Sequence, residues 1–343
     1  MVFTSIDLNF IWFILIGVLL TGYAILDGFD LGVGALHLFT HSDQERRIMI
    51  NAIGPVWDGN EVWLVTGGGA LFAAFPDVYA SVFSGFYSAF MLLLAVLIFR
   101  AVAIEFRSKQ EMIWWRQMWD IAFSISSIFI SFLMGVTLGN LIVGVPIDGT
   151  KGFSISIVEL LNPYSSLVGI TTVALFMMHG AIYTVMKTDG AMQKNVRSWV
   201  NNTIIFFVIS YVTTTMATLL YMPHMAEPFK HHPVFFGVAL AGMLSIANIP
   251  REIHHHREIF AFFSSCASIA ALMALFAIGM FPNLVISNID PSYYLTIYNA
   301  ASSKKTLSIM LIFAIIGIPF VLAYTISIYW IFRGKVHLDS TSY

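Results

Sequence analysis

Four carboxyl residues lie inside two apolar stretches near the start of the chain. Asp27 and Asp30 are three residues apart in the first stretch, and Asp58 and Glu61 are three apart in the second. Residues at this spacing share a helix face. An ionisable group within a membrane span is costly and usually faces a polar interior, a partner or a proton path. The two pairs predict the mouth of a proton path, because a desolvated carboxyl group can exchange protons near neutral pH.

A second interpretation is that these acids lie at the membrane interface, where they cap helix ends or pair with Arg46 and Arg47. It suits Asp30, which lies nearest the end of its stretch, better than Asp27 or Asp58. Both interpretations stay open at this point.

Two more charged residues are candidates for ion pairing. Arg100 lies near the end of the third apolar stretch, and Asp120 opens the fourth. Arg100 could pair with a buried carboxylate, although the sequence does not identify which one.

We expect no haem ligand and no metal site on this chain. Haem iron takes axial His, Met or Cys, and a membrane cytochrome that holds two haems needs paired histidines on facing helices. Only His179 lies clearly within an apolar stretch, and the run His254 to His256 would point in three directions on a helix. The single cysteine excludes a four-cysteine iron–sulfur site. An autonomous haem-binding cytochrome is therefore disfavoured.

The composition shows which solvent surrounds these residues. The chain is 58% hydrophobic and 10% charged, with a mean hydropathy of +0.81, whereas soluble domains are roughly 25% charged. So few charges cannot cover a water-facing surface, and lipid is the natural solvent. The net charge of −2 gives no nucleic-acid footprint. We predict an all-α polytopic integral membrane protein.

About nine transmembrane helices are expected, from runs of roughly 20 apolar residues. The loops between them are short, so residues 1–343 form one transmembrane domain. Four spans separate the first from the fifth, which is compatible with two parallel four-helix repeats, 1–150 and 160–285, plus an extra helix, 307–332. The spans are 9–36, 54–74, 79–104, 119–144, 164–186, 200–221, 233–250, 259–281 and 307–332.

Basic residues predict the orientation, because cytoplasmic loops are rich in Lys and Arg. Of the 17 Lys and Arg residues, 13 fall in loops on one side or in the C-terminal tail. The N-terminus is therefore expected outside and the C-terminus in the cytoplasm, which needs an odd number of spans. The 13 residues are Arg46, Arg47, Arg100, Arg107, Lys109, Arg116, Lys187, Lys194, Arg197, Arg251, Arg257, Arg333 and Lys335.

One family is visible in the motifs. The run Gly54–Arg107 contains Trp-Asp-Gly-Asn-Glu-Val-Trp at a predicted helix start, and Leu26–Gly34 reads Leu-Asp-Gly-Phe-Asp-Leu-Gly-Val-Gly. With Tyr294–Ala300 and Pro319–Tyr324, these segments closely resemble subunit II of the bacterial cytochrome bd-type quinol oxidases, including the cyanide-insensitive branch. The resemblance extends over nearly the whole chain.

The resemblance implies a subunit of a terminal oxidase that oxidises quinol and reduces dioxygen to water in the aerobic respiratory chain. In the family, the b-type and d-type haems and the quinol-oxidation site belong to subunit I. Subunit II supports assembly and proton delivery from the cytoplasm, and in some members it holds a structural quinone. The chain would then be a non-haem-binding subunit of an electrogenic enzyme in the bacterial inner membrane. Its partners would be subunit I, small accessory membrane subunits, quinol, dioxygen and lipid.

Asp27 and Asp58 match the family's acidic positions on its first two helices, and Asp58 is the residue that we expect to line a proton path. The competing function is a secondary transporter or ion channel with intramembrane carboxylates. It would need broken helices in both halves of the chain. The run Gly67–Gly69 could be one such break, but the second half shows no obvious counterpart.

Overall fold

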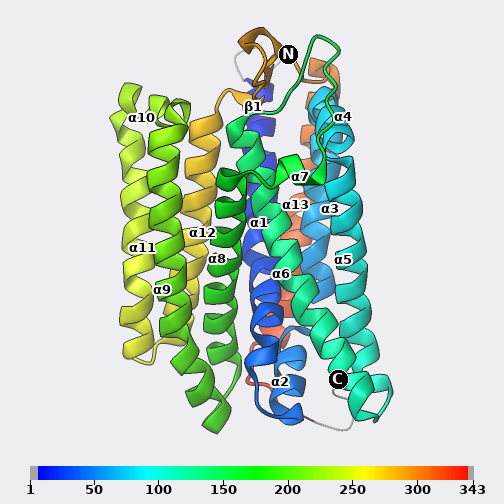
Figure 1. Ribbon diagram of the computed structural model, residues 1–343, viewed down its shortest axis with the longest axis vertical. Helices are drawn as coiled ribbons and strands as arrows, with labels where there is room; N and C mark the ends of the chain where they lie inside the picture. The colour runs from blue at the N-terminus through cyan, green and yellow to red at the C-terminus, as the bar shows by residue number, and fades with distance from the viewer. Residues whose placement is uncertain (1–6, 339–343) are drawn as a thin grey trace.

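A computed structural model describes residues 7–338, which form a bundle of long helices along one common axis (Figure 1). The predicted all-α membrane architecture is confirmed, and each predicted span overlaps one long helix. The helix α1 begins at the end of the bundle that holds the strand β1, and α13 ends at the opposite end (Figure 1). The long helices are α1 Leu8–Leu36, α3 Trp57–Ala74, α5 Tyr87–Phe106, α6 Ile113–Val143, α8 Pro163–Lys187, α9 Gly190–Tyr221, α11 Phe236–His254, α12 Glu258–Met280 and α13 Lys304–Ile331.

Among these helices, α3 is the exception in composition. The other eight are long and apolar enough to cross a membrane. The helix α3 has only 18 residues and carries both Asp58 and Glu61. It begins beyond α2, a helix over Asp43–Ile53 that lies beside the last turns of α1 (Figure 1). We expected a loop where α2 lies, and this was wrong. Ser42 caps α2 by accepting from the Glu45 amide.

The predicted third span, 79–104, consists of two helices. The helix α4 covers Pro76–Gly85, and α5 starts at Tyr87. Phe86 separates them with a backbone that is not helical. The connections on this side of the bundle include α7 (Ile157–Leu160), α10 (Glu227–His231) and a hairpin of β1 (Asn283–Val285) paired antiparallel with β2 (Leu295–Thr296).

The helix α1 is central and packs against α3, α6 and α8. Its contact with α8 depends on glycine, because a Cβ added at Gly32 would stand 1.8 Å from the Phe176 carbonyl oxygen and 2.8 Å from the Gly180 nitrogen. A Cβ added at Gly28 would stand 2.8 Å from the Phe176 ring. The close helix contact expected from Gly28 and Gly32 is therefore present within the chain. The repeat of two four-helix halves stays a prediction.

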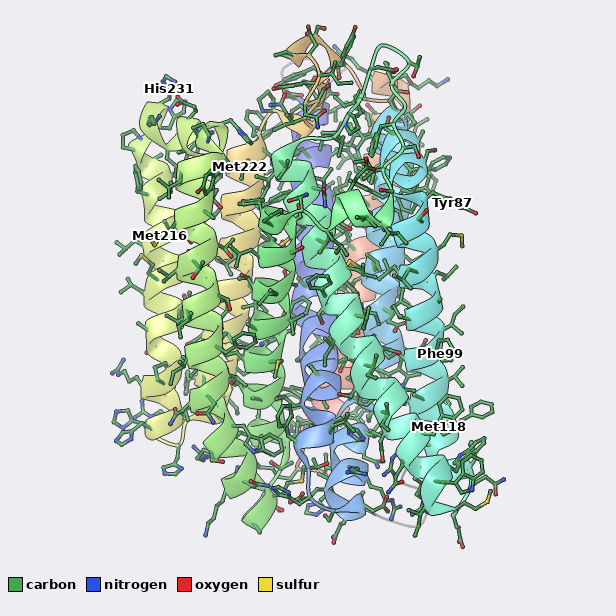
Figure 2. All side chains as sticks on the ribbon, viewed as in Figure 1. Tyr87, Phe99, Met118, Met216, Met222 and His231 are labelled. Carbon is green, nitrogen blue, oxygen red and sulfur yellow. The ribbon has the colours of Figure 1, made fainter. Side chains whose placement is uncertain are left out.

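The outer surface of the bundle is apolar. Side chains of Phe99, Met118 and Met216 point away from the helices (Figure 2). Phe99 is 57% exposed, whereas its neighbour Arg100 is fully buried. The helix α5 thus turns a phenylalanine outward and a guanidinium inward, as a helix between lipid and a polar interior must.

Candidate functional site

The centre of the candidate site is Arg100 on α5. Its guanidinium donates to both carboxylate oxygens of Asp27 on α1, at 2.6 and 3.1 Å, and to Oε1 of Glu61 on α3, at 2.7 Å. The Arg100 and Asp27 side chains are fully buried, and that of Glu61 is 25% exposed. Charged hydrogen bonds of this kind are among the strongest in proteins. They join three helices around one cation.

Asp30 belongs to the same buried region but has a different partner. Its Oδ2 accepts a hydrogen bond of 2.7 Å from Nδ2 of Asn60 on α3. The same amide nitrogen donates to the Leu26 carbonyl oxygen at 3.1 Å, and Oδ1 of Asn60 accepts from the Tyr329 hydroxyl at 2.9 Å. The helix α13 therefore reaches the acids of α1 through a single amide. Asp30 is fully buried, so it does not lie at a water-exposed helix end.

Asp58 lies apart from these bonds. It stands in the first turn of α3, is exposed on the surface of the chain, and forms no ion pair with a described residue. It does not cap α3, because the N-cap position is Val56 and no side chain bonds there. Glu61, one turn further along α3, turns inward to Arg100. The two acids of α3 thus occupy an outer and an inner position.

Three buried polar atoms around Arg100 have no hydrogen-bond partner among the described residues. They are the Tyr23 hydroxyl, Oδ1 of Asp30 and Nε of Arg100. Tyr23 and Asp27 are four residues apart on α1 and therefore share a face. Buried polar atoms in proteins are normally bonded to other groups or to ordered water. The unused bonding capacity of these three atoms is suited to a hydrated polar thread.

Asp120 on α6 is the centre of a second, separate charge cluster. Its carboxylate accepts from Nε of Arg107 at 2.5 Å and lies 2.6 Å from Nε2 of His37. Arg46 on α2 adds a bond of 3.2 Å, and Asp43 binds Arg107 from the same helix. The structure gives Arg100 and Asp120 different partners. The Asp120 cluster ties the end of α1 to α2, α5 and α6, and it leaves Arg46 no role with Asp27 or Asp58.

His179 on α8 is a structural contact between helices. Its Nδ1 lies 2.7 Å from the Ser265 hydroxyl on α12, and its Nε2 lies 2.9 Å from the Ile25 carbonyl oxygen on α1. The ring stacks on Phe262 with a centroid distance of 5.0 Å. Both ring nitrogens are engaged within the chain. Within residues 7–338, no three His, Cys, Asp or Glu side chains come together as a metal site.

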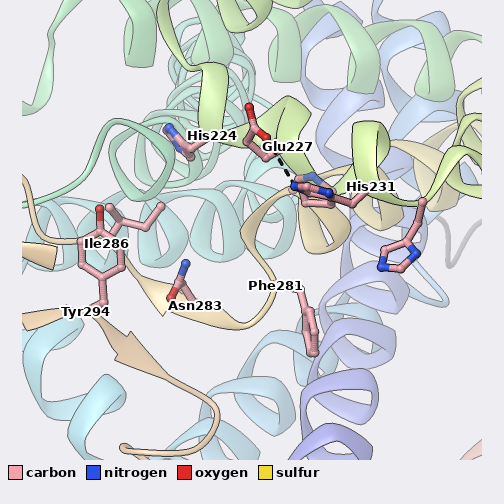
Figure 3. A pocket seen from close by; sticks show the side chains of 10 residues that line it. His224, Glu227, His231, Phe281, Asn283, Ile286 and Tyr294 are labelled. Atoms are coloured by element: carbon pink, nitrogen blue, oxygen red, sulfur yellow. Dashed lines mark ion pairs between the residues drawn. The ribbon is translucent and has the colours of Figure 1, made fainter. Parts of the chain in front are cut away.

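A pocket of about 430 Å³ (Figure 3) lies at the end of the bundle that holds α10 and β1, opposite α2 (Figure 1). His224, Glu227 and His231 line one side, and Phe281 and Tyr294 line the other. Nε2 of His231 lies 3.7 Å from the Glu227 carboxylate. Burial lowers the pKa of His224. No residue of the acid cluster around Arg100 lines this pocket.

Sequence reasoning missed three residues of the site. Asn60 stands between Asp58 and Glu61 in the motif, and its position next to two acids was a usable signal. Tyr23 is one helical turn from Asp27, which was a weaker signal. Tyr329 gave none, because it lies in the ninth apolar run, 269 residues from Asn60.

Comparisons with known proteins agree with one another. A family model described as cytochrome bd terminal oxidase subunit II matches residues 8–332. The chain is 36% identical over 360 residues to cytochrome bd-I ubiquinol oxidase subunit 2 of Escherichia coli K12, covering 96% of this chain and 95% of that one. It is 35% identical over 339 residues to cytochrome bd ubiquinol oxidase subunit 2 of Bacillus subtilis 168, covering 98% and 99%. Its fold is similar to a chain of the bd oxidase from Geobacillus thermodenitrificans, with a TM-score of 0.77 and 17% identity over 95% and 98% of the two chains.

Proposed function

Because the chain belongs to the family of cytochrome bd terminal oxidase subunit II, we propose that its acid cluster delivers cytoplasmic protons for oxygen reduction. The protein is thus a multi-pass inner-membrane component of a quinol oxidase, an oxidoreductase of the respiratory chain, and its family implies a subunit I partner. The same matches favour the oxidase over a secondary transporter or ion channel.

One observation carries the proposal, which is the excess of buried carboxyl groups over cations. Asp27 and Glu61 share Arg100, and Asp30 lies one turn from Asp27 on α1. Among residues 7–338, Arg100 is the only cation in an ion pair with these acids. An uncompensated charge away from bulk water costs several kcal/mol. The cluster therefore favours holding at least one proton, and a group that holds a proton beside an ionised neighbour can pass it on.

The proposed route begins at Asp58. A carboxylate that faced hydrocarbon would be unstable, so the exposed position of Asp58 suits a contact with subunit I or with water. The same face of α3 presents Val62 and Val65, which are 54% and 73% exposed, and nothing lies within 4 Å of a Cβ added at Gly68 or Gly69. This open, small-residue face supports close packing of a second membrane chain there.

The inner acids then move the proton deeper. In the proposed route, the Glu61 proton passes to Asp27 through water in the polar thread, because Arg100 binds both carboxyl groups but has no acceptor atom with which to relay a proton itself. Arg100 stabilises whichever carboxylate is ionised after each transfer. In this proposal the chain's own part in catalysis is to hold and move protons, and we assign the b-type and d-type haems, the oxygen chemistry and the quinol-oxidation site to subunit I. Bound quinone or small accessory subunits would lie outside this route.

The orientation that we propose for the chain supports uptake from the cytoplasm. The end of the bundle with α2 and the Asp120 cluster carries most of the basic residues, including Arg46, Arg107 and Arg116. Under the positive-inside rule this end faces the cytoplasm. Asp58 and Glu61 lie in the first turns of α3, which begins directly after α2, and so they are near this end of the bundle.

Asp58→Asn tests the proposal. Asn keeps the shape and a hydrogen bond but cannot carry the proton, so the complex should assemble with full haem content and lose most of its quinol-dependent oxygen uptake per haem. Asp77→Asn is the matched control, since Asp77 is an exposed acid of α4 paired with Lys151; its turnover should stay normal. Normal turnover per haem in Asp58→Asn would contradict the route. Lower stability with normal turnover of the surviving complex would show a structural role instead.

A further inference from the structure

The amide of Asn60 has no unused hydrogen-bonding atom and only one usable orientation. Its contact with the Leu26 carbonyl, at 3.1 Å, requires the amide nitrogen on that side, because a carbonyl can only accept. The amide oxygen must then face α13, where the Tyr329 hydroxyl donates to it at 2.9 Å. Asn60 is 2% exposed, so water does not replace this donor freely.

This orientation determines which oxygen of Asp30 can carry a proton. The Asn60 nitrogen donates to Oδ2 of Asp30 at 2.7 Å, and an amide N–H cannot accept a proton from that oxygen. The other oxygen, Oδ1, is buried and has no partner among residues 7–338. Any proton on Asp30 is therefore directed to Oδ1.

We infer that Tyr329 is a positioning residue, which together with the Leu26 carbonyl holds Asn60 so that Asp30 takes up and releases its proton at Oδ1. This inference rests on the proposed proton route, to which it adds a residue of the last helix. In each transfer, the O–H bond of a neighbouring acid or water breaks, its electron pair stays on that oxygen, and a new O–H bond forms at Oδ1. No electron is transferred, and no further reactant is needed.

The attachment of α13 agrees with this role. Leu307 is the only buried residue of α13. Among residues 7–338, two hydrogen bonds that involve a side chain join α13 to other helices. Trp12 donates to the Leu307 carbonyl at one end of α13, and Tyr329 donates to Asn60 near the other end. Tyr329 also meets the Phe29 ring edge-on at 6.4 Å. A helix with so little burial thus places one hydroxyl beside the acids of α1.

The test compares Tyr329→Phe with Tyr324→Phe in the purified complex. Tyr324 lies on the same helix, is 64% exposed and is a matched control. Loss of a buried hydrogen bond corresponds to a roughly two- to tenfold effect, so Tyr329→Phe should lower oxygen uptake per haem by about that factor and move its pH profile. The carboxyl C=O infrared band that disappears in Asp30→Asn should shift in frequency in Tyr329→Phe. Tyr324→Phe should change none of these.

Each remaining outcome has a distinct meaning. If Tyr329→Phe matches Tyr324→Phe in turnover, pH profile and infrared band while Asp58→Asn is slow, the positioning role is wrong and the proton route stands. If Asp58→Asn also turns over normally, the route itself has failed. Because turnover and spectrum are both measured per haem in assembled complex, a lower yield does not obscure the result. Asn60→Ala is the second variant, and an unshifted Asp30 band in it would also overturn the inference.

Discussion

Gly32 of α1 and Gly180 of α8 cross with their backbones in contact, so that a Cβ added at Gly180 would stand 2.4 Å from the Gly32 carbonyl carbon. No side-chain movement can relieve this overlap, because the neighbouring atoms are backbone. The crossing also sets the depth of Asp30, two residues before Gly32. The acid cluster therefore depends on a glycine contact that carries no charge.

Gly32→Leu should sharply lower the yield of haem-bearing complex, since α1 and α8 would have to separate. Gly17→Ala, on the same helix, is the control, because nothing lies within 4 Å of a Cβ there. Haem absorbance per mass of membrane protein measures the yield. A normal yield and spectrum in Gly32→Leu would show that the two helices are not packed as described.

Arg100→Gln should destabilise the complex strongly. Removing one partner of a buried ion pair costs about 3–5 kcal/mol, because the remaining charge is left uncompensated. Adding Asp27→Asn to Arg100→Gln should restore part of the stability, since it removes one stranded carboxylate. Thermal denaturation, followed by haem release, compares the two variants. Equal stability of the single and double variants would mean that Asp27 is not the partner that matters.

His179→Ala should leave the haem content of the complex unchanged and lower its thermal stability. The reason is that both ring nitrogens bond within the chain, to Ser265 and Ile25, so the ring has no free ligand atom. Pyridine haemochrome analysis of purified complex gives the haem count. Loss of one haem without loss of assembly would contradict the structural role.

A reporter fused at Tyr343 should be active only as a cytoplasmic reporter. Tyr343 itself lies outside the described residues, and the prediction rests on the basic end of the bundle, where α13 ends (Figure 1). A periplasmic reporter that is active at this position would reverse the orientation and with it the proposed source of the protons.

The spans and the acids were predictable from sequence because each leaves a local signal. A run of apolar residues is read directly, and a carboxyl group within such a run is conspicuous. The break within the third span could not be predicted, because a single residue, Phe86, separates α4 from α5 and leaves the apolar run uninterrupted. The helix α2 was missed because Arg46 and Arg47 made its segment look like a loop, although Met49 and Ile53 bury its other face.

The partners within the site could not be predicted, since pairing depends on how helices meet. Arg100 is 73 residues from Asp27, and nothing in the local pattern distinguishes Asp27 from Asp58 as its partner. Tyr329 was out of reach for the same reason. The glycines and acids of the sequence identified α1 as the helix of the site. Which atoms touch is shown only by the packing of α5 and α13 near it.

The depth of Asp27 also has a consequence for work against the membrane voltage. Nine residues separate it from the end of α1, which is about 14 Å of helix, in a hydrocarbon layer of roughly 30 Å. A proton that moves from the cytoplasm to this depth in the membrane crosses nearly half of the transmembrane electric field. At 100 mV this costs about 1 kcal/mol. That energy corresponds to about a fivefold change in rate. Proton entry through this chain should therefore slow oxygen consumption as a closed vesicle becomes polarised, and an ionophore that collapses the voltage should restore it.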